Sequence, residues 1–183
     1  MSKIGESPIQ IGKDIKIDIS GTTCMISGKE GALKFLIPSL LKVELQEGVV
    51  QVKTQKTNRQ SRALHGLYRS LIANAIAGVQ KPWQKRLEIV GTGFNVKLEG
   101  ENLVFKVGYS HPVIFKKVEG IKFQTEGNNL VILSGSDKQL VGQIAQRIKL
   151  IKKPDVYKGK GIKYEGERLR IKPGKKTKTA DAA

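Results

Sequence analysis

The order of the periodic segments repeats once along the chain, and this repeat limits the fold more than any other feature. A hairpin pattern over residues 42–54, with its turn at Glu47-Gly48, is followed by a helical pattern in which apolar pairs recur every four residues from Ala63 to Ile76. We expect this helix to have Asn58 as its N-cap and to end at Gly78. A second hairpin pattern, with its turn at Glu126-Gly127, is followed by a second helical pattern that ends at Pro154. The two turns are 79 positions apart, and the two helical patterns align at an offset of 77.

This repeat predicts an α+β protein of two tandem, internally duplicated domains. Strand-like alternation precedes the first hairpin, and the segments RLEIV, FNVKL, LVFKVGY and PVIFKK precede the second. We expect each domain to be an antiparallel sheet packed against a helix, over residues 1–82 and 83–153, with a basic tail over 154–183. The alternative is that two unrelated units resemble each other only because hairpins and amphipathic helices are common.

The charge of the chain indicates a polyanionic partner. The 183 residues include 33 Lys and Arg against 16 Asp and Glu, a net charge of +17, while 39% hydrophobic content is enough for a buried core. The charge is concentrated near the end, because residues 147–178 contain thirteen basic and three acidic residues. Nucleic acid and an anionic membrane surface are the two partner classes that fit such a field.

The compartment follows from cysteine use and hydropathy. A single cysteine, Cys24, excludes an intramolecular disulfide and a cysteine-based zinc site. The N-terminal MSKIGESPIQIG has no apolar signal region, and no run reaches the 18 apolar residues of a spanning helix. We therefore expect a cytoplasmic protein that is neither secreted by a signal peptide nor embedded in a membrane.

No group of residues in the sequence predicts catalysis or a cofactor. His65 and His111 have no neighbouring Cys, His or carboxylate at a metal-binding or nucleophile-activating spacing. GTGFNV, at residues 91–96, lacks the third glycine and the following helix of a dinucleotide site, and GKGIK, at 159–163, lacks P-loop spacing. We expect no enzyme activity, no cofactor, no metal and no small-molecule substrate.

The tail has the composition of a nucleic-acid-binding segment. In YKGKGIKY, glycines allow close approach of the backbone to phosphate, lysines supply charge, and Tyr157 and Tyr164 can stack on exposed bases. Because it has little to bury, we expect it to be disordered alone and to order on RNA, so that removing residues 155–183 leaves both domains folded. A flexible solvated end, an anionic lipid surface and DNA are the alternatives.

Several separated motifs resemble one known family. PDVYKGKGIKYEGERLRIKPGKK at 154–176, GYSHPV at 108–113, DKQLVGQIAQRI at 137–148 and the opening MSKIGESPI are similar to the bacterial form of ribosomal large-subunit protein six. The resemblance extends from Met1 to about Lys178. It departs from the family at Asp155-Val156, where a Glu-Pro pair is usual, and at Lys3, where arginine is frequent.

The resemblance implies a function. Members of that family are structural proteins of the large ribosomal subunit that bind its rRNA near the sarcin-ricin loop, beside other ribosomal proteins at the base of the factor-recruiting stalk. A nucleic-acid-binding module outside the ribosome remains the alternative. By similarity to the family, the rRNA contacts are Tyr157, Lys158, Gly159, Lys160, Gly161, Lys163 and Tyr164. Charge alone adds five further contacts: Arg168, Arg170, Lys172, Lys175 and Lys176.

Overall fold

The chain divides into two compact units. The computed structural model describes residues 3–12, 14–46, 48–56 and 58–174. The first unit contains Met1–Gln84 together with Ser134–Val141, and the second contains Lys85–Leu133 together with Gly142–Ala183. The division falls beside the expected boundary at residue 82. Residues 134–141, expected in the second domain, lie with the first unit, and the segment expected as a tail lies with the second.

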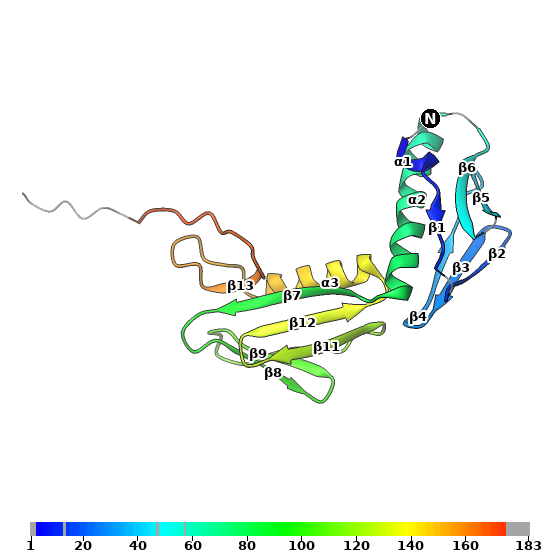
Figure 1. Cartoon of the computed structure of the whole chain (residues 1–183). Helices are drawn as coiled ribbons and strands as arrows, with labels where there is room; N and C mark the ends of the chain where they lie inside the picture. The colour runs from blue at the N-terminus through cyan, green and yellow to red at the C-terminus, as the bar shows by residue number, and fades with distance from the viewer. Residues whose placement is uncertain (1–2, 13, 47, 57, 175–183) are drawn as a thin grey trace, which may run out of the picture. The chain divides into compact units, whose positions relative to one another are not determined.

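The first unit consists of two small antiparallel sheets and one long helix (Figure 1). One sheet has the strand order β1-β6-β5 and the other β2-β3-β4. The elements are α1 (Lys3–Glu6), β1 (Ile9–Gln10), β2 (Lys16–Ser20), β3 (Thr23–Gly28), β4 (Gly31–Leu36), β5 (Leu41–Gln46), β6 (Val49–Thr54) and α2 (Arg59–Gln80).

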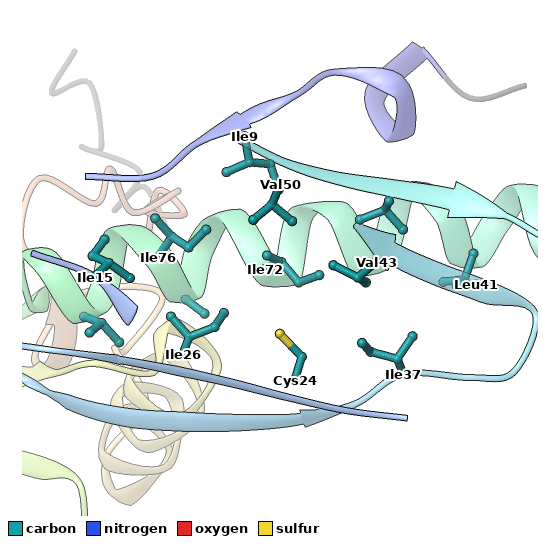
Figure 2. Packing of buried hydrophobic residues seen from close by; sticks show 13 residues of the cluster. Ile9, Ile15, Cys24, Ile26, Ile37, Leu41, Val43, Val50, Ile72 and Ile76 are labelled. Carbon is teal, nitrogen blue, oxygen red and sulfur yellow. The ribbon is translucent and has the colours of Figure 1, made fainter. Parts of the chain in front are cut away.

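The core of this unit is made by the alternating strand residues and by one face of α2 (Figure 2). Cys24, Ile26 and Val50 are fully buried, and they meet Ile72 and Ile76 of the helix. Burying an isoleucine or valine side chain stabilises a fold by about 1.5–3 kcal/mol. The apolar alternation of the sequence is therefore the inner face of the sheets.

The helix α2 begins as the sequence predicts but ends later. Asn58 is its N-cap, and its backbone N–H donates to the Ser61 hydroxyl at 2.8 Å. We expected Gly78 to end the helix, but α2 continues to Gln80. Gly78 is a packing glycine instead, since a Cβ there would lie 2.0 Å from the Ser136 carbonyl oxygen and 2.7 Å from the Trp83 indole nitrogen.

The second unit repeats the hairpin-then-helix order. Its sheets have the strand orders β11-β12-β7-β13 and β10-β9-β8. Its elements are β7 (Trp83–Val90), β8 (Asn95–Glu99), β9 (Asn102–Lys106), β10 (Val113–Phe115), β11 (Ile121–Glu126), β12 (Leu130–Gly135), α3 (Lys138–Ile151) and β13 (Gly161–Tyr164). The predicted α+β class with antiparallel sheets is confirmed, with β5–β6 before α2 and β11–β12 before α3.

The core of the second unit is built from the same pattern. Leu87, Ile89 and Leu133 of the sheet are buried, as are Ile144 and Ile148 of α3. These two helix residues belong to the predicted apolar stripe. Figure 1 shows α3 running alongside β7.

The first part of the expected tail is a strand of this unit, which corrects the expectation of a segment that is disordered alone. Gly161–Tyr164 forms β13, which pairs antiparallel with β7 in the register Gly161↔Val90 to Tyr164↔Leu87. Ile162 is fully buried. Composition did not predict this strand. One buried apolar residue, Ile162, and the edge of a sheet formed by the much earlier strand β7 are enough to order the segment.

In the part of the chain that the structure describes, no helix is both long enough and apolar enough to span a membrane.

Candidate nucleic-acid interface

The basic segment is presented on a closed loop between α3 and β13. The Asp155 N–H donates to the Lys160 carbonyl oxygen, and the Gly159 N–H to the Asp155 carbonyl oxygen, both at 2.9 Å. The Lys158 N–H donates to a carboxylate oxygen of Asp155 at 3.0 Å. The loop is therefore shaped before any partner binds, which lowers the entropy that binding must remove.

The two glycines of the loop have a structural reason in the folded protein. Gly161 has a φ of +148°, and a Cβ there would lie 2.7 Å from the Lys153 carbonyl oxygen. Gly159 has a φ of +68° and is buried, with Leu169 and Ile171 beside it. Its N–H already has an acceptor in Asp155. Both glycines thus permit the chain to close, a role that sequence reasoning did not give them.

Four of the predicted contacts are exposed cations. The described residues include no carboxylate partner for any of their side chains, which therefore keep their full charge toward the solvent. The segment that carries three of them lies back on the loop, because the Lys172 N–H donates to the Val156 carbonyl oxygen at 2.8 Å. These cations are Lys158, Arg168, Arg170 and Lys172.

Two predicted lysines have partners within the second unit. The Lys160 ammonium donates to the Thr92 hydroxyl at 3.3 Å, so the GTGFNV turn borders the candidate interface. The Lys163 ammonium lies 3.0 Å from a Glu88 carboxylate oxygen, and only 24% of its side chain is exposed. Lys163 is therefore partly neutralised before an RNA approaches.

The two tyrosines of YKGKGIKY differ in their surroundings. Tyr157 is 58% exposed, and its ring is accessible to a base. Tyr164 is half-buried, and its ring has the ammonium groups of Lys85 and Lys149 at 5.4 Å and 4.6 Å from its centroid. This ring holds cations and is not free to stack.

One carboxylate fixes the end of β13. Glu167 pairs with the Lys149 ammonium at 2.5 Å and accepts the Tyr164 N–H at 2.9 Å. The Lys149 contact, together with that N–H, lowers the pKa of Glu167 below its usual value. Glu167 therefore stays ionised and joins α3 to the strand.

The loop before β10 packs against the end of α3, next to the candidate interface. The Tyr109 hydroxyl donates to the Ile151 carbonyl oxygen at 2.8 Å, and the Lys152 ammonium lies 4.6 Å from the centre of the Tyr109 ring. Sequence reasoning did not include Lys85, Lys149, Lys152 or Tyr109 among the contacts. The only signal was GYSHPV, which carried the resemblance but was given no role.

Comparison with known proteins identifies the family. The model of the family described as ribosomal protein L6 matches residues 11–82 and 90–165, one match for each half of the duplication. The large ribosomal subunit protein uL6 of Synechococcus sp. strain RCC307 is 44% identical over 175 residues, covering 96% of this chain and 98% of the relative. The chain belongs to the ribosomal protein L6 family. The uL6 protein of Chlorobium phaeovibrioides is also 44% identical, with the same coverage.

Membership of the ribosomal protein L6 family makes this a structural ribosomal protein and not an enzyme. The residues that an enzyme would need have other roles here. His65 is 3% exposed, and its Nε2 donates to the Val52 carbonyl oxygen at 2.7 Å. His111 lies on an exposed bend. Burial raises the pKa of the Cys24 thiol, which disfavours a reactive thiolate.

The match to the L6 family also bears on the segment expected as a tail. The second matched region ends at residue 165, so it includes β13. The departure from the usual Glu-Pro pair falls at Asp155, whose carboxylate accepts the Lys158 N–H within the loop. Two of the predicted contacts, Lys175 and Lys176, lie outside the described residues.

Proposed function

We propose that this protein is a structural constituent of the large ribosomal subunit, in the cytoplasm, and that it supports translation by binding large-subunit rRNA through the loop 155–160 and residues 168–176. This proposal extends its membership of the ribosomal protein L6 family to a particular surface. The protein neutralises phosphate charge where RNA segments converge, and no chemistry on a substrate is involved.

The observation that carries the proposal is the fixed position of the exposed cations. Lys158, Arg168, Arg170 and Lys172 project from a segment that β13 anchors in the sheet, and in the described residues their charges have no carboxylate partner. Tyr157 adds an exposed ring among them. Cations on an ordered backbone, with an aromatic ring between them, suit RNA, which is recognised by phosphate positions and by exposed bases. A flexible solvated end would need none of this order.

We place this contact near the sarcin-ricin loop, beside ribosomal proteins at the base of the factor-recruiting stalk. The support is the resemblance of PDVYKGKGIKYEGERLRIKPGKK to the family segment that makes this contact. The test is chemical footprinting of large subunits rebuilt with and without the protein. Protection that appears in other rRNA regions and leaves the sarcin-ricin loop unchanged contradicts the placement, although rRNA binding itself would stand.

The binding surface is tested by neutralising Arg168, Arg170 and Lys172 with glutamine. All three side chains are exposed, so the fold should be retained. The control carries the same loss of charge at three other exposed lysines, as Lys16→Gln, Lys34→Gln and Lys97→Gln. Binding to protein-free large-subunit rRNA is measured over a range of salt concentrations. We expect the slope of log affinity against log salt to fall by about three for the test variant, one for each lost phosphate contact.

Equal losses in the two variants would mean that only net charge is recognised, and would contradict the proposed surface.

The alternative function, as a nucleic-acid-binding module outside the ribosome, is tested by competition at matched salt. Large-subunit rRNA should displace the protein from duplex DNA and from anionic vesicles, because RNA shape and unpaired bases add to charge. Stronger competition by DNA would favour the alternative nucleic-acid-binding module.

A further inference from the structure

Three lysines of the second unit lie over tyrosine rings, and two of them, Lys85 and Lys152, have no carboxylate partner among the described residues. The Lys85 ammonium, on β7, lies 5.4 Å from the centre of the Tyr164 ring, and the Lys152 ammonium, just after α3, lies 4.6 Å from the centre of the Tyr109 ring. In the described part of the chain neither ammonium has a carboxylate partner. Neither lysine belongs to the contacts expected from the sequence.

Two neighbouring lysines have carboxylate partners as well. Lys149 pairs with Glu167 at 2.5 Å, and Lys163 pairs with Glu88 at 3.0 Å. A carboxylate fixes a lysine but cancels its charge, so a phosphate must displace it. A ring face attracts the ammonium through its quadrupole without adding a negative charge. Lys85 and Lys152 therefore keep their charge and lose part of their conformational freedom in advance, which is what a pre-organised phosphate contact requires.

The rings themselves are fixed by the fold. Tyr164 lies in β13, whose backbone N–H donates to Glu167, while Tyr109 donates its hydroxyl to the carbonyl oxygen of Ile151. The Lys152 carbonyl oxygen accepts the N–H of Ile162 in β13 at 2.9 Å. Both lysines are thus attached to well-packed backbone on either side of β13.

The groups form one connected series. Lys85 and Lys149 share the Tyr164 ring, and Lys152 follows Lys149 by three positions at the end of α3, where it meets Tyr109. Lys152 lies one residue beyond the end of α3, and its carbonyl oxygen accepts the N–H of Ile162, two residues before Tyr164 in β13. The series therefore joins β7, β13, the end of α3 and the loop before β10 into one basic surface.

We propose that Lys85 and Lys152 are phosphate contacts of this surface, positioned by Tyr164 and Tyr109, so that the folded part of the second unit binds the rRNA backbone alongside the loop and the C-terminal segment. The inference rests on the proposed function. It adds two lysines of the folded domain, with the tyrosine rings that position them, to the contacts expected from the sequence.

The experiment compares Lys85→Met, Lys152→Met and the double variant with Lys97→Met, an exposed lysine on β8 without an aromatic or carboxylate partner among the described residues. The full-length proteins are titrated with protein-free large-subunit rRNA over a range of salt concentrations, and their thermal midpoints are recorded. We expect the slope of log affinity against log salt to fall by about one for each single variant and about two for the double variant. Lys97→Met should leave the slope unchanged.

The positioning role is tested at the ring. Tyr164→Phe keeps the aromatic face and should bind like the unchanged protein, whereas Tyr164→Leu should lower the affinity while the thermal midpoint of the protein is monitored. If Tyr164→Leu destabilises the fold, the lysine variants, whose side chains are not buried, still decide the matter. Slopes that stay unchanged in the double variant, or that fall equally with Lys97→Met, overturn the inference. Failure of the unchanged protein to bind rRNA would instead reject the proposed function.

Discussion

At the scale of single residues, the glycines of the basic loop show how a binding motif can have a folding reason. From the sequence, the glycines of GKG were expected to let the backbone come close to a phosphate group. In the structure Gly161 is buried against Lys153 and Pro154, where a side chain has no room. The binding that we propose for the loop would then depend on these glycines indirectly, because they place the lysines that flank them.

Replacing Gly161 with alanine should destabilise the protein by about 1–3 kcal/mol or more, because a positive φ is strained for other residues and the new Cβ meets backbone atoms. The control is Gly142→Ala in α3, where a Cβ has nothing within 4 Å. It should stabilise the helix by about 0.5–1 kcal/mol. Denaturant unfolding of both variants measures the two changes. An unchanged free energy of unfolding in Gly161→Ala would show that the Lys153–Pro154 backbone moves freely.

Glu167 predicts a pH dependence. Its folded pKa is lowered, so the stability that it contributes is present above its usual pKa and is lost as pH falls through the folded value. We expect the unchanged protein to be more stable than Glu167→Gln near neutral pH, and the difference to shrink below about pH 4. Thermal midpoints measured from pH 3 to 7 test this. A difference that is constant over this range would contradict the Lys149 pairing.

At the scale of elements, β13 decides where the second domain ends. The strand is four residues long, yet it completes a four-stranded sheet and buries Ile162 fully. It pairs with β7, which lies far earlier in the chain. The basic loop is therefore an insertion between α3 and the last strand, and only the residues after it resemble a tail.

Truncation tests the place of β13 in the second unit. Removing residues 155–183 deletes β13 and should unfold or strongly destabilise this unit. Ile162→Ala, which deletes only the buried side chain, should cost about 2–5 kcal/mol. Circular dichroism during thermal unfolding distinguishes these outcomes. Full stability after this truncation would restore the expectation from sequence that both domains fold without residues 155–183.

At the scale of the whole molecule, the net charge of +17 predicts that the association of the protein with the ribosomal subunit depends on salt concentration. We expect it to sediment with the large ribosomal subunit from a cell extract at low salt and to be released at high salt, since phosphate contacts weaken steeply with salt. Immunodetection across the gradient measures this. Sedimentation as a free protein at low salt would contradict a place in the subunit.

The sequence by itself determined the two repeats, their antiparallel hairpins and the buried faces of both helices, because periods of two and of about four residues report which side of an element meets the core. It also determined the family, through separated motifs. Only the tertiary structure decided that Gly161–Tyr164 belongs to the sheet, that Lys163 pairs with a carboxylate, and that Lys85 and Lys152 lie against tyrosine rings. These outcomes depend on pairing between segments distant in the chain, such as Tyr164 with Leu87. The local periodicity of a short strand does not indicate which sheet edge it will pair with.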